Sequence, residues 1–222
     1  MNPLPPITKY LLWAIGIGFV LQQLAEGPAI TWFALWPWAE VPIGNGEVHQ
    51  LFQPWQLVTH ALLHGNFIHL FVNAIGLFQF GGRIEYALGR KRFITFALVC
   101  TVGAGLTQLL VSTAMVDSGS QPFPTVGISG FIYGLLLAYG LMYPHERVML
   151  MLPPVEMSAR TMAIAFGALS LFMGVTGTAG GIAHFAHLGG MLAGWLLLRT
   201  WQGKPPFGGR KPPKRPNLRS VN

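Results

Sequence analysis

Six apolar runs alternate with polar or Gly- and Pro-rich segments along the chain, and we interpret each as a helix that spans a membrane. Several are shorter than the ~20 residues that a straight spanning helix needs, so some helices should begin inside a cavity lined by protein. The pattern predicts an all-α membrane protein, a bundle of six transmembrane helices. The runs cover Ile7 to Ala25, Asn66 to Gly82, Phe93 to Met115, Gly127 to Tyr143, Thr161 to Val175 and Ala183 to Thr200.

Composition agrees with the apolar pattern. Of the 222 residues, 52% are hydrophobic and only 9% are charged, and the chain contains 28 Gly and 17 Pro. This balance is too apolar and too rich in Gly for a typical soluble domain, and it indicates a polytopic membrane protein. The single cysteine, Cys100, excludes an intrachain disulfide, and its apolar surroundings predict a small buried hydrophobic residue.

The net charge of +7 does not indicate a nucleic-acid partner, because the basic residues fall between the apolar runs or in the C-terminal tail. All 14 Lys and Arg residues lie on one side of the predicted membrane, while the loops of the other side carry only four acidic residues, Glu26, Glu40, Glu47 and Asp117. The positive-inside rule therefore predicts that both termini are cytoplasmic. We expect a multi-pass protein of a bacterial inner membrane.

Two loops and the tail are expected to do more than connect helices. The loop from Glu26 to Gln56 contains four Trp, a residue that favours the boundary between water and lipid, so we expect an embedded first outer loop or an ordinary aromatic belt. The "TGTAGG" segment, residues 176 to 181, is flexible enough for a lid, or is a plain turn. We divide the chain into a membrane domain, residues 1–201, and a basic, Pro- and Gly-rich cytoplasmic tail, residues 202–222, near anionic lipid.

Four polar residues interrupt the apolar pattern around the second run. At ~100° per residue, His60 and His64 share one helical face, and His69 and Asn73 share the opposite one, so one straight helix cannot direct all four to a single point. Asn66 offers a helix start as N-cap. We therefore expect His60 and His64 to end the preceding loop, and His69 and Asn73 to face inward together from the first helical turns.

A second pattern joins the fourth and sixth runs. In "GISG", residues 127 to 130, Ser129 opens the fourth run, although a Ser is also a common helix cap. His187 shares a helical stripe with Gly190 and Gly194, and small residues in such a stripe allow helices to approach closely. If these runs meet through glycines, Ser129 and His187 form a nucleophile–base dyad. His69, Asn73 and the backbone N–H of Ser129 are then available to stabilise an oxyanion.

The segments "THALLHGNFIHLFVN", "GISG" and "AHLGGMLAG" resemble the hallmark motifs of the rhomboid family of intramembrane serine proteases, in family order across all six runs. The resemblance implies a rhomboid-like bundle, cleavage of transmembrane protein substrates in the lipid bilayer, and no cofactor or metal. It also implies the roles of individual residues. These are Ser129 as nucleophile, His187 as base, His69 and Asn73 as oxyanion stabilisers, Tyr133 as the aromatic residue beside the histidine, and Glu85 as the acidic member of "GGRIE".

Two positions depart from a simple match. His184 is a rival base, but only His187 has the spacing to Gly190 and Gly194 that the family pattern carries. The family often has Trp-Arg in the first outer loop where this chain has Trp55-Gln56, which puts the usual polar anchoring of that loop in doubt.

Peptide hydrolysis needs water, so we expect a hydrophilic pocket that is open to the outer side and covered by the 176 to 181 loop. Its expected lining is His60, His64, His69, Asn73 and Ser129. Substrate helices with Gly, Pro or small residues near their outer end should unwind more readily and be preferred. Two other functions stay possible. One is a catalytically inactive rhomboid-like protein that binds membrane helices, and the other is a haem or metal protein that uses its histidines as ligands.

Overall fold

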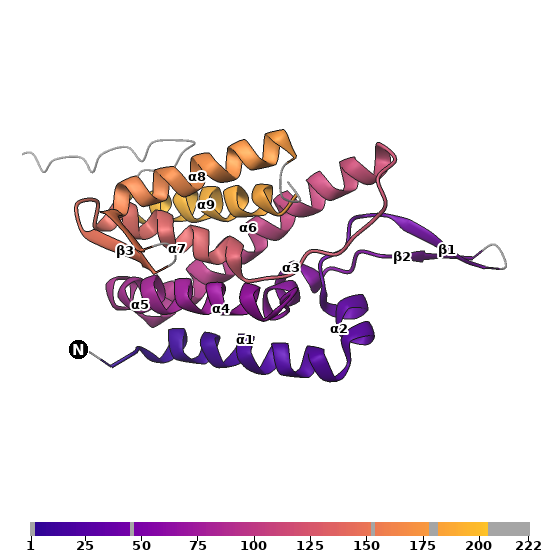
Figure 1. The fold of residues 1–222 in the computed structure, drawn as a ribbon, viewed down its shortest axis with the longest axis horizontal. Coiled ribbons are helices and arrows are strands. Elements are labelled where there is room, and N and C mark those ends of the chain that lie inside the picture. Colours follow the sequence, from indigo (N-terminus) through magenta and orange to yellow (C-terminus); the bar gives the residue numbers. More distant parts are fainter. Residues whose placement is uncertain (1–2, 45–46, 152–153, 178–181, 204–222) are drawn as a thin grey trace, which may run out of the picture.

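A computed structural model describes residues 3–44, 47–151, 154–177 and 182–203. A helix occupies each of the six predicted runs (Figure 1). Four of the described helical segments are long and apolar enough to cross a membrane, and α7 is a shorter apolar helix. The bounds of the helices are α1 (Pro6–Leu24), α4 (Phe67–Gly76), continued by the π-helical η2 (Leu77–Gly81) and by α5 (Gly82–Leu88), α6 (Arg90–Asp117), α7 (Ser129–Met142), α8 (Ala159–Thr176) and α9 (Ile182–Trp201).

Two helix boundaries differ from the sequence expectation. The second predicted helix does not stop at Gly82, because the π-helical turn η2 carries it on through α5 to Leu88. The fourth starts at Ser129 and not at Gly127, because Gly127 has a φ of 117°, which no helix accommodates. This turn brings the chain into α7 with Ser129 as its first helical residue.

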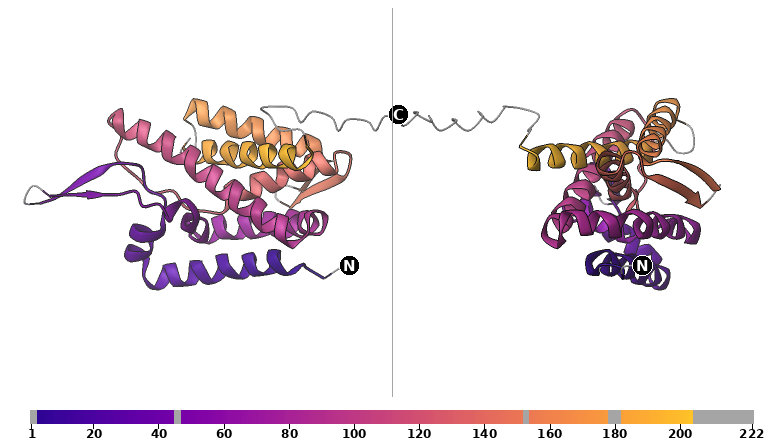
Figure 2. Two further views of the ribbon diagram at one scale, coloured as in Figure 1. Left: turned by 180° about the vertical axis from the view of Figure 1, so that it is seen from behind. Right: turned by 90° about the vertical axis from the view of Figure 1, so that its left-hand side faces the viewer.

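Helix α7 forms the centre of the bundle, and most of its residues are buried. It packs against α6, α8 and α9 on one side and against the α4–α5 segment on the other, while α1 lies outside α4 (Figures 1 and 2). Glu85 fastens the start of α1. Its carboxylate accepts hydrogen bonds from the backbone N–H of Ile7 (3.0 Å), and from the backbone N–H (2.7 Å) and hydroxyl (2.8 Å) of Thr8.

The α7–α9 contact forms through glycines, as their spacing predicts. A Cβ atom on Gly190 would overlap the carbonyl group of Gly130, and Gly134 faces the Gly190 carbonyl oxygen. The stripe does not serve α7 alone, however. Gly194 lies against Phe96 and Cys100 of α6, and Cys100 is fully buried as expected. The glycines of α9 therefore bring it close to α7 and to α6 at the same time.

This packing gives a prediction for Gly190→Ala. The new methyl group would enter the Gly130 backbone, which cannot move away as a flexible side chain can, so we expect a loss of stability of at least ~1–3 kcal/mol. Thermal unfolding of the purified protein in detergent measures this loss. Gly16→Ala in α1 is the matched control, because nothing lies within 4 Å of its added Cβ atom. Equal melting temperatures for the two variants would contradict the close approach.

The first loop contains more structure than a connection needs. It consists of α2 (Glu26–Phe33), a hairpin of β1 (Glu40–Gly44) and β2 (Glu47–Gln50) that extends away from the helices (Figure 2), α3 (Gln56–Thr59) and the 3-10 helix η1 (His60–Leu62). Gln56 is completely buried. Its side-chain oxygen accepts from the backbone N–H of Trp36 and Gln53, and its nitrogen donates to the carbonyl groups of Thr31 and Leu51. Gln56, at the position where the family often has Arg, thus supplies the polar anchoring of this loop. That the loop is embedded in lipid stays a prediction.

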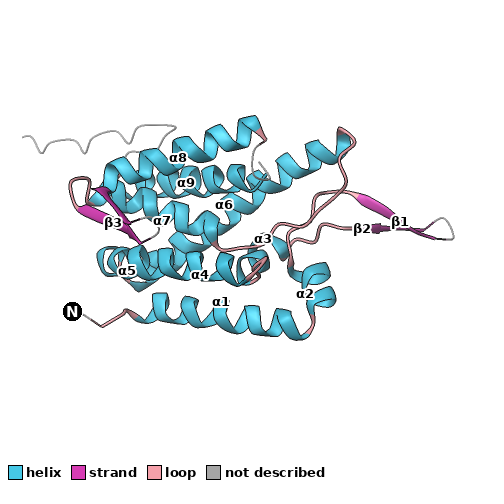
Figure 3. Cartoon of the chain, in the orientation of Figure 1, coloured by secondary structure: helices cyan, strands magenta, loops and turns pink. Residues whose placement is uncertain are grey.

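A second hairpin joins α7 to α8 and was not expected in an all-α fold (Figure 3). Strands β3 (Arg147–Met151) and β4 (Pro154–Ser158) pair antiparallel. The Gln79 side chain donates to the carbonyl oxygen of Met149 (2.9 Å), and Arg83 pairs with Glu146 (2.8 Å). The hairpin is therefore attached to α4–α5 as well as to α7 and α8.

The described Lys and Arg residues lie in α5, in strand β3, or near the ends of other helices, and these elements meet at one end of the bundle. Figure 1 shows the start of α1, α5 and the β3–β4 hairpin together at that end. Helix α7 ends near the β3–β4 hairpin, and Ser129 lies at its opposite end. Most of the expected lid, residues 178–181, and most of the predicted tail, residues 204–222, lie outside the described residues.

Candidate active site

A cavity of about 390 Å³ lies between α4, α7, α8 and α9. Polar groups gather where α7 begins, and apolar side chains continue the wall as far as Leu150 of the β3–β4 hairpin. The polar lining includes His69, Asn73, Ser129 and His187. The structure thus brings together four of the residues that the sequence singled out.

Ser129 and His187 are in hydrogen-bond contact. The Ser129 Oγ lies 2.8 Å from Nε2 of His187, although the two residues are 58 positions apart in the chain. The turn at Gly127 places Ser129, since the Gly127 N–H donates to the carbonyl oxygen of His60 (2.9 Å) and fixes the segment before α7 against the first loop. The separation is that expected for a hydroxyl next to a general base.

The ring of His187 is held from two sides. Tyr133, one turn after Ser129, stacks on it with 4.0 Å between ring centroids and an angle of 8° between the planes. The hydroxyl of Ser170 on α8 lies 3.5 Å from Nδ1, a long contact. Sequence reasoning missed Ser170, although an isolated Ser in the apolar fifth run was a signal that could have found it. Ser170 occupies the position at which a serine-protease triad has its acidic residue.

His184 is close to His187 but is placed differently. Its ring meets the His187 ring edge-on, with 5.8 Å between centroids, and it does not line the cavity. Both ring nitrogens of His184 are buried without a hydrogen-bond partner among the described residues. Of the two rival bases, His187 is the one whose ring contacts Ser129.

His69 and Asn73 face the dyad from α4. The side chain of Asn66 accepts from the backbone N–H of His69 (2.8 Å), so the predicted helix start at Asn66 is confirmed. A Cβ atom on Gly127 would lie 2.9 Å from Nε2 of His69, which shows how closely the loop before Ser129 passes the imidazole. The side-chain nitrogen of Asn73 is buried and has no partner among the described residues. A buried donor without a partner is uncommon, and here it borders the cavity.

His60 and His64 do not line the cavity, contrary to expectation. The η1 turn and the extended residue after it redirect both side chains, so that His60 contacts the Gln56 carbonyl oxygen through Nδ1 (2.7 Å) and approaches Gly105 of α6. His64 is fully buried, its backbone is bound on both sides by the Gln22 side chain, and its ring meets that of His69 edge-on. Burial, reinforced by the charge of nearby His69, lowers the pKa of His64 to about 4, which keeps its ring neutral.

Histidine side chains are also common metal ligands. Within residues 3–44, 47–151, 154–177 and 182–203, no group of three or more His, Cys, Asp or Glu side chains is arranged to hold a metal ion. The geometry at His187 is instead that of a hydroxyl–imidazole pair beside an amide donor.

The helices and this pair define the class of the chain, a helical membrane protein with a serine–histidine pair inside its bundle. Residues 51–202 match the family model of the Rhomboid domain, and the chain belongs to the rhomboid family. It is similar to the Rhomboid protease GlpG of Yersinia enterocolitica serotype O:8, Yersinia pestis and Yersinia pseudotuberculosis serotype O:3, with 28% identity over 198 residues in each case. These alignments cover 88% of this chain but only 62% of each relative.

Proposed function

We propose that this chain is an intramembrane serine endopeptidase that hydrolyses peptide bonds in or beside the transmembrane helices of membrane proteins. The observation that carries the proposal is the 2.8 Å contact between Ser129 Oγ and His187 Nε2, inside a cavity that the side-chain amide of Asn73 also borders. The match to the rhomboid family and the similarity to rhomboid proteases support the same activity. Membership in this family does not favour a haem or metal protein.

The chemistry follows from this pair. His187 Nε2 accepts the Ser129 proton as the hydroxyl oxygen attacks the carbonyl carbon of the substrate, and a tetrahedral intermediate forms. The imidazolium then gives that proton to the leaving amine, so the C–N bond breaks and an acyl-enzyme remains. Water hydrolyses the ester by the same proton route. For this, Nε2 must be the unprotonated nitrogen and Nδ1 carries the proton, which points toward the Ser170 hydroxyl.

Oxyanion stabilisation is the role that we propose for His69, Asn73 and the backbone N–H of Ser129. The side-chain nitrogen of Asn73 is a buried donor with no partner in the described part of the chain, so a carbonyl oxygen that becomes negatively charged would find a prepared hydrogen bond. This bond would be stronger in the transition state than in the bound substrate, and it therefore contributes to the rate of reaction.

For Asn73→Ala we expect kcat to fall by roughly 10- to 1000-fold, with little change in KM, because one oxyanion donor is lost. Steady-state cleavage of a helical substrate in liposomes separates the two constants. Val72→Ala is the control for packing. Val72 lines the same cavity beside Asn73, and this substitution removes apolar side-chain atoms but no hydrogen-bond donor. A kcat equal to that of the unmodified protein would exclude Asn73 from this role.

The apolar part of the cavity favours an extended, apolar stretch of substrate. A helix hides its carbonyl groups in internal hydrogen bonds, so a substrate must unwind locally before attack, and Gly, Pro or small residues near its end lower that cost. The distribution of Lys and Arg supports an orientation with both termini in the cytoplasm, so that the dyad lies near the outer face. The similarity to proteins of Yersinia supports a bacterial inner membrane.

The activity is tested with the purified chain in liposomes that contain a single-pass model substrate. We expect cleavage within or beside the spanning helix and covalent labelling of the chain by a fluorophosphonate probe. An inactive relative that only binds membrane helices would retain the substrate without cleaving it and would not react with the probe. That result would overturn the proposed activity.

A further inference from the structure

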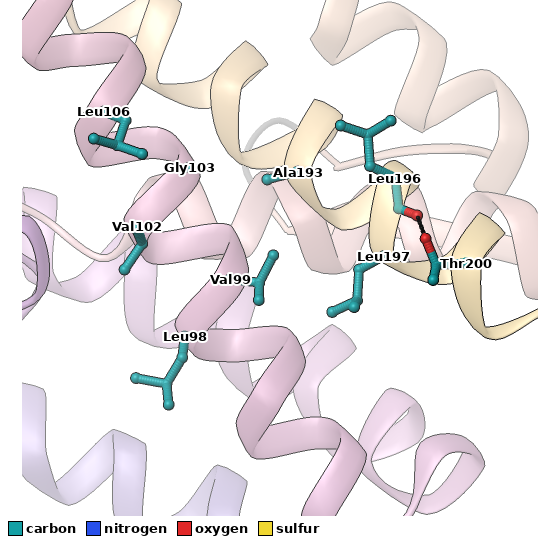
Figure 4. Close-up of a pocket in the computed structure, with 9 residues that line it drawn as sticks. All are labelled: Leu98, Val99, Val102, Gly103, Leu106, Ala193, Leu196, Leu197 and Thr200. Atoms are coloured by element: carbon teal, nitrogen blue, oxygen red, sulfur yellow. Dashed lines mark hydrogen bonds between the residues drawn. The ribbon is translucent and has the colours of Figure 1, made fainter. Parts of the chain in front are cut away.

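A second hollow lies on the surface of the bundle, between α6 and α9, and shares no lining residue with the active-site cavity. It is an open groove of about 530 Å³ with almost entirely aliphatic walls (Figure 4). Val99, Val102 and Leu106 line it from α6, and Leu196 and Leu197 line it from α9. Gly103 and Ala193 bring the two helices into contact beneath it. Because this apolar groove is open on the surface of a helical membrane protein, we expect lipid to cover it.

Positive charge lies just beyond the end of this groove that Leu98 and Thr200 line. Arg92 lies on the same helical stripe as Thr95, Val99, Val102 and Leu106, because these residues follow each other at intervals of three or four. The guanidinium of Arg92 lies over the Trp201 ring, 5.5 Å from its centroid, at the end of α9. An Arg held by Trp at a helix end is placed at the level of lipid headgroups. A cationic site at the expected membrane surface is therefore followed along this stripe by the apolar groove.

The length of this stripe favours a lipid over a helix. From Arg92 to Leu106 is 14 residues, which at 1.5 Å per residue gives about 21 Å. One leaflet contributes about half of a hydrocarbon core of about 30 Å, so the stripe from Arg92 to Leu106, which includes the groove, extends across one leaflet and little further. A transmembrane helix from a substrate or from a second copy would need a contact surface along the full thickness of the hydrocarbon core.

We propose that this groove binds an anionic phospholipid, with one acyl chain along Val99, Val102 and Leu106 and the phosphate at Arg92. The ligand class follows from the two parts of the site, since the aliphatic walls suit a hydrocarbon chain and the guanidinium suits a phosphate oxygen pair. The site does not depend on the proposed peptidase activity.

Native mass spectrometry of the full chain, released from detergent with added dioleoylphosphatidylglycerol or dioleoylphosphatidylcholine, tests the proposal. We expect the unmodified chain to retain the anionic lipid preferentially. Arg92→Gln should weaken retention of phosphatidylglycerol about fivefold, the effect expected for one basic residue at an anionic lipid surface. Arg90→Gln is the matched control, because it removes the same charge from the same helix end about 200° around the axis from Arg92.

The acyl-chain part is tested separately with Val102→Phe, which fills the groove and leaves Arg92 in place. Retention of phosphatidylglycerol should fall, whereas Leu192→Phe, at a position on α9 that is 57% exposed and outside the groove, should have no effect. Melting temperatures confirm that each variant is folded. Equal retention of the two lipids by the unmodified chain, or equal losses from Arg92→Gln and Arg90→Gln, would overturn the proposal. Displacement of a dimer by Val102→Phe would assign the groove to a second copy instead.

Discussion

Ser129→Ala is expected to abolish cleavage of a membrane-embedded substrate, with a loss of roughly 10⁴-fold or more. The substitution removes only the oxygen that contacts His187, so no atom remains at that position to attack a carbonyl carbon. Neighbouring water is a much weaker nucleophile and is not held in line with the base. The measurement is cleavage of a single-pass substrate in liposomes over a long incubation, with the products identified by mass spectrometry.

The fold should survive this substitution, since the backbone of α7 and its glycine contacts are unchanged. The melting temperature should stay close to that of the unmodified chain, and fluorophosphonate labelling should disappear. Ser118→Ala, at the far end of α6, is a control that should keep both cleavage and labelling. If the Ser129→Ala protein still cleaved its substrate, the nucleophile would have to be another residue.

His187→Ala should lower the rate almost as much as Ser129→Ala. Without the imidazole, nothing accepts the Ser129 proton at 2.8 Å, and the hydroxyl remains a poor nucleophile at neutral pH. The loss should appear in kcat more than in KM, because proton transfer occurs on the way to the transition state. Single-turnover cleavage at saturating enzyme isolates this step from product release.

His184→Ala is the matched comparison, because it removes an imidazole one helical turn away that does not contact Ser129. We expect substantial residual activity, with some loss from the edge contact to the His187 ring. Should His184→Ala be inactive and His187→Ala active, the base would be His184, and the ring stacking of Tyr133 would have no catalytic meaning.

The sequence was sufficient to locate the helices and to single out Ser129 and His187, whose side chains the structure brings into contact. Apolar runs of this length can satisfy their backbone groups in lipid only as helices, so the position of each helix followed from hydropathy. Asn66 as a helix start is a local property that a short segment determines. The glycine stripe of the sixth run correctly predicted contact with the fourth, because only small residues allow two backbones to come so close.

The tertiary structure decided where the remaining polar groups point. His60 and His64 were expected to line the pocket, but a 3-10 turn and two hydrogen bonds between the Gln22 side chain and the backbone of His64, 42 residues away, hold this segment outside it. Gln56 anchors the first loop through partners that no spacing rule reveals. The β3–β4 hairpin, the Ser170 contact and the groove beside Arg92 likewise arise where separate segments meet.

These differences have one physical origin. Burial in lipid and backbone hydrogen bonding act on consecutive residues, and the sequence therefore determined the helices and the local starts and breaks within them. The direction of a side chain depends on how each helix is rotated and which distant partner satisfies a buried polar group, so only the packed bundle decided that Ser129 meets His187 while His60 and His64 do not share their cavity.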